Sequence, residues 1–261
     1  MYKLLAKLLL VAAVLTLGIG SEVRVTQVQA LSTEISPMES LKSEIISQLA
    51  QQQTEINVTY DGDKSELSKG IAELLRQAVS ADDYIAYIVD SYFYTVRTWG
   101  ASAKIKLAVA YRETAEQSRL VEERIERVLS AIINPGMTVR EKVRQIHDWV
   151  VTNVEYDLSL SRYTAYEALT EGSAVCQGYT LLMYRMLKMA GIENRIIEGE
   201  VDTGSHVWNL VKIDGQWYHL DATWDDPTPN RAGAVSYNYY LKNDEQMRKD
   251  HTWVKPYPAS N

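Results

Sequence analysis

The sequence predicts an α+β fold, and three observations support this prediction. Its 261 residues are 46% hydrophobic and 23% charged, which is typical of globular proteins and excludes disordered, collagenous and coiled-coil chains. Helix-capping patterns and apolar residues at helical spacing gather in the middle of the chain. Segments rich in aromatic and β-branched residues follow them. Runs of helices and then of strands favour α+β over a strictly alternating α/β chain.

The charge balance argues against nucleic acid as a partner. The chain has 27 basic and 34 acidic residues, which gives a net charge of −7. Nucleic-acid-binding proteins usually carry a basic patch or a long basic run, and the sequence has no such run. We therefore expect no nucleic-acid partner, and nothing in the composition calls for a cofactor.

The first thirty residues, 1–30, are predicted to be a signal peptide. Lys3 and Lys7 form a basic start, and Leu8–Gly20 is uncharged and mostly apolar. This run is too short to cross a hydrocarbon core of ~30 Å as a helix, but it suits a secretory signal. Val28 and Ala30 supply small residues for cleavage after Ala30. We expect a secreted or extracytoplasmic mature protein without an integral membrane span; the alternative is an uncleaved N-terminal anchor.

The next elements form a predicted N-terminal α+β region over residues 56–133. Residues 31–55 are polar and are predicted to be a linker or a loose helix. Predicted strands cover 56–60, 88–98 and 103–112, and an intervening helix has its apolar stripe at Leu67, Ile71, Leu74, Leu75 and Ala78. Asp61-Gly62-Asp63 resembles the start of a calcium loop, but Glu66 and Ala72 break the pattern. It is therefore interpreted as a turn and helix cap.

Residues 134–261 are predicted to form a second, C-terminal domain. Capping boxes at 114–117 and 138–141 begin two helices, and a third helix over 175–190 ends at Gly191. The predicted strands that follow are 192–201, 205–213, 216–223 and 237–241, with a short helix over 243–249.

Cys176 is the only cysteine of the chain, so it forms no internal disulfide. It lies at the predicted start of a helix, where the positive end of the helix dipole stabilises a thiolate. A lone thiol in an oxidising compartment is a liability unless it is used or buried. Cys176 is therefore either a nucleophile or a buried small hydrophobic residue.

A predicted hairpin brings a histidine and an aspartate together. Asp214-Gly215 is a strong two-residue turn signal, and it pairs Ile213 with Gln216. Continued along both strands, this register makes His206 and Asp221 diagonal neighbours on one face, within reach of a hydrogen bond. The opposite face is then apolar, with Val207, Val211, Ile213, Leu220 and Ala222.

Other interpretations of these polar residues stay open. His206 and Asp221 could each be an ordinary residue of a sheet, and His219 is a rival base on the same face. His147 lies in the middle of a helix and is expected to be structural. A metal site made by His206, His219 and Asp221 is conceivable, but the spacing matches no zinc motif, so we expect no metal.

These motifs resemble the transglutaminase-like superfamily. The resemblance rests on 164–166, on the segment 172–179 around Cys176, on His206-Val207-Trp208-Asn209 and on 221–225. It is most specific over 163–227, and residues 56–133 resemble the front half of secreted bacterial members. The resemblance implies a papain-like core, in which a nucleophile helix packs on an antiparallel sheet, with the N-terminal region as an accessory.

The resemblance also implies the catalytic roles. Cys176 would be the nucleophile, His206 the base and Asp221 the residue that orients the base. The implied activity is acyl transfer on peptide or protein amides through a thioester, as in proteases, amidases or transglutaminases. Trp208 and Trp224 could line the acyl site or could pack within the sheet. The resemblance makes residues 134–261 the transglutaminase-like catalytic domain. The sequence given shows no sign of the extra β-sandwich domains or of the calcium loop of the large animal transglutaminases. The alternative function is a non-catalytic binding or cell-envelope scaffold module on the same fold.

Overall fold

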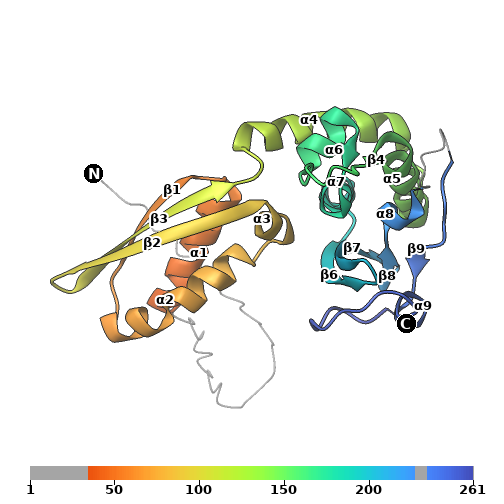
Figure 1. Ribbon diagram of the computed structural model, residues 1–261. Coiled ribbons are helices and arrows are strands. Elements are labelled where there is room, and N and C mark those ends of the chain that lie inside the picture. Colours follow the sequence, from red (N-terminus) through yellow and green to blue (C-terminus); the bar gives the residue numbers. More distant parts are fainter. Residues whose placement is uncertain (1–34, 227–233, 261) are drawn as a thin grey trace, which may run out of the picture. The chain divides into compact units, whose positions relative to one another are not determined.

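The computed structural model describes residues 35–226 and 234–260 (Figure 1). It combines helices with antiparallel sheets, which confirms the predicted α+β class. The predicted signal peptide lies outside the described residues. Over the ranges described, none of the helices combines the length and the apolar character needed to cross a bilayer. The predicted domain boundaries after residues 55 and 133 stay predictions.

The N-terminal part holds a three-stranded antiparallel sheet in the order β1-β3-β2 (Figure 1). Its elements are α1 (Pro37–Ala50), β1 (Glu55–Tyr60), α2 (Lys64–Val79), α3 (Asp83–Ile88), β2 (Val89–Trp99) and β3 (Ser102–Tyr111). The segment predicted as a linker or loose helix contains α1, whose buried face is Leu41, Ile45 and Leu49. Asp63 caps α2 by accepting from the backbone N–H of Ser65, as expected for the turn and cap at this site. The sequence analysis missed α3, which Asp82 caps.

The C-terminal part holds a parallel pair β4-β5 and a four-stranded antiparallel sheet in the order β6-β7-β8-β9. Its helices are α4 (Ala115–Ile132), α5 (Val139–Asn153), α6 (Ala165–Glu171), α7 (Cys176–Met189), α8 (Ala222–Asp225) and α9 (Asp244–Met247). Its strands are β4 (Glu155–Tyr156), β5 (Ser173–Ala174), β6 (Asn194–Val201), β7 (Gly204–Ile213), β8 (Gln216–Leu220) and β9 (Tyr240–Lys242). Both predicted capping boxes form, at the starts of α4 and α5.

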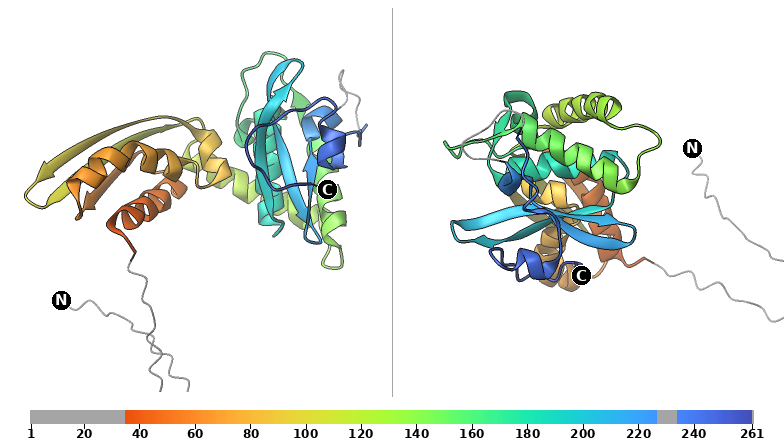
Figure 2. Two further views of the ribbon diagram at one scale, coloured as in Figure 1. Left: turned by 90° about the horizontal axis from the view of Figure 1, so that it is seen from below. Right: turned by 90° about the vertical axis from the view of Figure 1, so that its right-hand side faces the viewer.

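The four-stranded sheet has a different core on each face. The predicted apolar face of the hairpin belongs to the main core, into which α7 also packs, and the Thr180 hydroxyl donates to the carbonyl of Val207 at 3.0 Å. The other face carries a small cluster of Ile197, Trp208, Leu210 and Met247. Figure 2 shows helices α5 and α7 on one side of this sheet and α9 on the other. Residues that alternate along β7 therefore enter two separate environments.

The predicted hairpin register is confirmed near the turn and wrong beyond it. Asp214 and Gly215 both have positive φ, as a tight two-residue turn requires, and Ile213 pairs with Gln216. The ladder ends at Asn209 and Leu220, so the strand predicted to reach residue 223 stops three residues early. The strand stops because the next residue, Asp221, caps α8 with its carboxylate, and the chain turns out of the sheet there.

Candidate active site

Cys176 is the first residue of α7, and its side chain is partly exposed. The backbone N–H of Val175, the residue before it, donates to the carbonyl of Arg162, which fixes the approach to the helix. No side chain caps this helix start. Backbone donors at a helix start have no partner within the helix, and together with the dipole they stabilise a negative charge. The position therefore suits both a thiolate and an oxyanion.

His206 lies on β7 and is only 5% exposed. Its Nε2 lies 2.7 Å from Oδ2 of Asp221, and the Cys176 side chain is close enough to the ring to raise the pKa of His206. Because Nε2 is occupied by Asp221, Nδ1 is the nitrogen left for the thiol. Burial alone would lower the pKa of His206, but the charge and hydrogen bond of Asp221, together with Cys176, raise it to about 10. The imidazole is therefore held in its protonated form at neutral pH.

Asp221 is the N-cap of α8 and is fully buried. Its Oδ1 accepts from the backbone N–H groups of Thr223 and Trp224, at 3.0 and 3.2 Å. Burial by itself would raise the pKa of this carboxyl, but the His206 charge and the hydrogen bonds from His206 and His251 lower it well below its usual range. The helix start thus fixes Oδ1 of Asp221 and leaves Oδ2 for His206.

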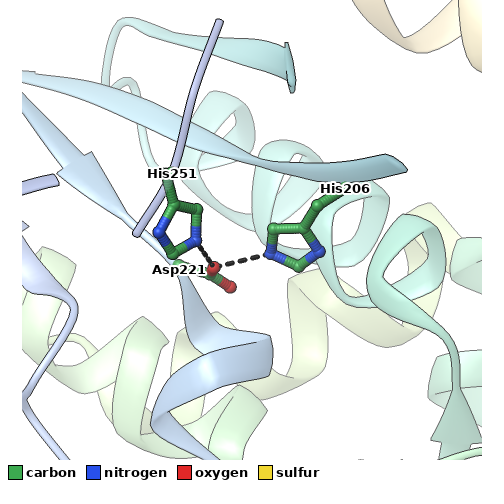
Figure 3. A group of neighbouring side chains, drawn as sticks. All are labelled: His206, Asp221 and His251. Carbon is green, nitrogen blue, oxygen red and sulfur yellow. Dashed lines mark hydrogen bonds and ion pairs between the residues drawn. The ribbon is translucent and has the colours of Figure 1, made fainter. Parts of the chain in front are cut away.

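His251 is the residue of this site that the sequence analysis missed. Its Nε2 lies 3.1 Å from the same Oδ2 of Asp221, so two imidazoles approach one carboxylate oxygen from opposite sides (Figure 3). It lies 30 residues from Asp221 along the chain, in the segment after α9. No local sequence pattern could have revealed it, because only the folding of the C-terminal segment brings it there.

The two candidate tryptophans occupy different positions. Trp208 is fully buried, its ring stacks beside His206 with centroids 5.8 Å apart, and its Nε1 donates to Nδ1 of His219 at 2.9 Å. This position favours packing within the sheet, one of the two interpretations left open by the sequence. Trp224 is partly exposed, 6.0 Å from His206 between ring centroids, and is the better placed of the two to meet a ligand.

The other two histidines have partners of their own. His219, the rival base, is held by Trp208 and by Asp244, whose Oδ1 lies 2.9 Å from its Nε2. Burial lowers its pKa, so the ring stays neutral between these partners. His147 is fully buried and bonds to Asp148 and to Asp225, as expected for a structural histidine. Neither of these rings is bonded to Asp221.

The trio of His206, Asp221 and His251 also has the donor types of a metal site. One ligand atom from each lies within 4.8 Å of the others. Within residues 35–226 and 234–260, no other group of three histidine, cysteine, aspartate or glutamate side chains lies this close together. It differs from the trio considered from sequence, because His251 takes the place of His219. The spacings of 2.7 and 3.1 Å are those of hydrogen bonds to one shared oxygen.

Comparisons with known proteins show which families and structures this chain is similar to. Residues 126–222 match the sequence profile of the transglutaminase-like superfamily, a range that contains Cys176, His206 and Asp221. The human protein named kyphoscoliosis peptidase is 26% identical over 150 residues. That match covers 49% of this chain and 23% of the human protein, so the chain spans less than a quarter of this relative's length. The profile match confirms the resemblance drawn from the sequence motifs.

Two solved structures show a looser similarity. A crystal structure of a TGase has a TM-score of 0.39 at 13% identity, over 65% of this chain and 50% of that one. A structure described as a candidate cysteine protease from Cytophaga hutchinsonii has a TM-score of 0.35 at 14% identity, over 66% of this chain and 77% of that one.

Proposed function

Because residues 126–222 form a transglutaminase-like domain, we propose that the chain is a cysteine acyl-transfer enzyme that acts on peptide or protein amides. The observation that carries this proposal is the chain of contacts from the Cys176 thiol through His206 to the buried Asp221 carboxylate. A nucleophile, a base and a group that orients the base are the parts that amide cleavage through a thioester requires.

The proposed reaction begins with the Cys176 thiolate beside the His206 imidazolium. The sulfur attacks the amide carbonyl, and the backbone N–H of Cys176 at the start of α7 stabilises the oxyanion. His206 then gives its proton to the leaving amine, and a thioester remains on Cys176. Asp221 keeps the imidazole oriented and stabilises its charge throughout.

The second half of the reaction decides the enzyme class. Attack by water on the thioester gives a peptidase or amidase, and attack by a primary amine gives a transglutaminase. The same three residues serve both outcomes, since His206 removes a proton from either acceptor. We propose a peptide or protein of the cell envelope as the substrate, because the N-terminal thirty residues have the composition of an export signal.

The decisive experiment compares the wild type with Cys176→Ala. Both proteins are incubated with a panel of peptides containing glutamine, asparagine and ordinary peptide bonds, with and without a labelled primary amine. Wild type is expected to form cleaved or amine-labelled products, and Cys176→Ala to form none while keeping its melting temperature. Products that persist in Cys176→Ala would refute acyl transfer through this thiol. A wild type that binds peptides without turnover would support a non-catalytic module.

The proposed export has its own test. N-terminal sequencing of the protein recovered outside the cytoplasm should begin near Leu31, after cleavage at Ala30. Recovery of intact residues 1–30 on a cytosolic product would overturn the localisation.

A further inference from the structure

His251 has contacts that a passive core residue does not need. Its ring is fully buried, and its Nε2 lies 3.1 Å from Oδ2 of Asp221. Its Nδ1 lies 2.6 Å from Oδ1 of Asp250, whose other oxygen accepts from the hydroxyl of Tyr239 at 2.6 Å. Each ring nitrogen of His251 therefore lies within hydrogen-bond distance of a carboxylate oxygen. Both ends of the ring therefore have a carboxylate partner.

The bond to Asp221 falls on the oxygen that matters for His206. Oδ1 of Asp221 is used by the start of α8, whereas Oδ2 is the oxygen that faces both His206 and His251 (Figure 3). The carboxylate is buried, and each donor that it gains inside the protein stabilises its charged form. Burial raises the pKa of Asp221, but the charge and hydrogen bond of His206, followed by the hydrogen bond and charge of His251, lower it below its usual range.

The backbone fixes His251 independently of its side chain. The next residue, Thr252, pairs with Glu200 of β6 through two backbone hydrogen bonds of 2.9 Å. The backbone at Thr252 packs directly against Gly199, where an added Cβ atom would lie 2.0 Å from the Thr252 carbonyl oxygen. A glycine at position 199 is therefore what allows the C-terminal segment to reach the site.

We propose that His251 is a positioning residue of the acyl-transfer site, which holds the Asp221 carboxylate ionised and turned toward His206. The inference rests on the proposed function, since it acts through the same three residues. The series is then Tyr239, Asp250, His251, Asp221 and His206, ending at the Cys176 thiol.

The test uses the alkylation of Cys176 by iodoacetamide, followed by intact mass as a function of pH. Because the chain has a single cysteine, the rate reports this thiol alone and needs no substrate. In His251→Phe, which keeps an aromatic ring and removes both donors, the acid limb of the profile should move up by about one pH unit. The maximal rate should fall about tenfold, because Asp221 no longer orients His206 firmly.

Two amide variants separate the two ends of the ring. The side-chain nitrogen of glutamine overlays Nε2 of histidine, and that of asparagine overlays Nδ1. His251→Gln keeps a donor for Asp221 and should stay within about twofold of wild type, whereas His251→Asn should behave like His251→Phe. The matched control is His219→Phe, a buried histidine of the same layer with no bond to Asp221, which should leave the acid limb in place.

Each outcome decides between the two proposals. If wild-type Cys176 reacts no faster than free cysteine at pH 6, the proposed function fails. If wild type reacts fast and His251→Phe and His251→Asn match it, only the role of His251 fails. Loss of fast alkylation after EDTA treatment, with recovery on added Zn²⁺, would reassign the trio as a metal site and overturn the proposal.

A spectroscopic measurement on the wild type tests the same inference if the His251 variants do not fold. The chain has four histidines, so nitrogen-15 histidine labelling gives a simple imidazole spectrum. In wild type, Nε2 of His251 should carry a proton that is hydrogen-bonded to Asp221, and Asp221→Asn should shift this Nε2–H signal. A His251 ring without a proton on Nε2 would contradict the inference.

Discussion

At the scale of single residues, the site shows how partners decide the role of a histidine. His206 and His219 lie on adjacent strands of one sheet, and both are buried. His206 faces a buried carboxylate and a thiol, which raise its pKa to about 10 against the effect of burial. Burial lowers the pKa of His219, which accepts a hydrogen bond from the indole N–H of Trp208. The partners of His206 therefore favour its protonated, positively charged form, whereas the surroundings of His219 favour its neutral form.

Replacement of these two histidines should have unequal effects on the thiol. His206→Ala removes the imidazolium beside Cys176, so the rate of iodoacetamide alkylation at pH 6 should fall about 100-fold. His219→Ala removes a packing and hydrogen-bonding partner of Trp208, so it should lower the melting temperature and change the rate less than about threefold. Equal losses of rate in the two variants would contradict the assignment of His206 as the base.

The raised pKa of His206 also predicts a pH dependence of stability. An unfolded histidine loses its proton near pH 6.5 and the folded His206 near pH 10. The bond to Asp221 therefore contributes its full stabilisation below about pH 6.5, and this contribution is lost as the pH rises toward 10. The melting temperature of wild type should fall more between pH 7 and pH 10.5 than that of His206→Gln. Parallel curves for the two proteins would show that the pair contributes nothing to stability.

At the scale of elements, the start of α7 is packed so closely that its third residue must be glycine. A Cβ atom at Gly178 would lie 2.4 Å from the Cβ of Ala174 and 3.1 Å from the carbonyl oxygen of Thr164. These neighbours are a short strand and a helix cap, and neither can move without moving the Cys176 backbone. The nucleophile is thus placed by packing behind it as well as by the helix itself.

The same substitution at two glycines should therefore have opposite effects. Gly178→Ala should cost about 1–3 kcal/mol of unfolding free energy and slow the alkylation of Cys176, because it pushes the helix start away from β5. Gly70 lies in the middle of α2, and in Gly70→Ala the new methyl group would meet only the flexible end of the Met38 side chain. That variant should gain up to about 1 kcal/mol from helix propensity. Urea unfolding of both variants tests the contrast, and a stabilised Gly178→Ala would refute the packing argument.

At the scale of the whole molecule, a buried glutamate connects elements that are far apart in sequence. Glu113 is fully buried and accepts from the hydroxyls of Tyr84 and Ser118, at 2.5 and 2.6 Å. Its other oxygen accepts from the backbone N–H of Tyr166 at 3.0 Å. The carboxylate thus joins α3, α4 and α6, and α6 leads directly into β5 and α7.

Loss of the Glu113 carboxylate should destabilise the fold without removing any of the proposed catalytic side chains. Glu113→Ala leaves the hydroxyls of Tyr84 and Ser118 and the backbone N–H of Tyr166 without the acceptor that they use, so about 3 kcal/mol should be lost. For a chain of this size, that corresponds to roughly 6–12 °C in melting temperature. Glu126→Ala, at an exposed position of α4, is the matched control and should change stability by less than about 0.5 kcal/mol. A Glu113→Ala protein as stable as this control would show that the network carries no net stability.

The sequence by itself determined most of the elements, because their signals are local. Capping boxes at Thr114 and Thr138, the tight turn at Asp214-Gly215 and the helix that begins at Cys176 all depend on residues within one or two turns of chain. The motifs around Cys176 and His206 also predicted the resemblance to the transglutaminase-like superfamily, whose profile residues 126–222 match. The α+β class follows from the order of these local signals.

Only the tertiary structure decided how the site is completed. The sequence predicted that Asp221 and His206 lie within hydrogen-bond reach, but Asp221 does so as the cap of α8, just beyond the end of β8, and not from within the strand. His251 reaches the same carboxylate from a C-terminal segment that pairs with β6 over Gly199. Contacts of this kind leave no periodic trace in the sequence, since they depend on where distant segments pack and on which buried polar groups need a partner.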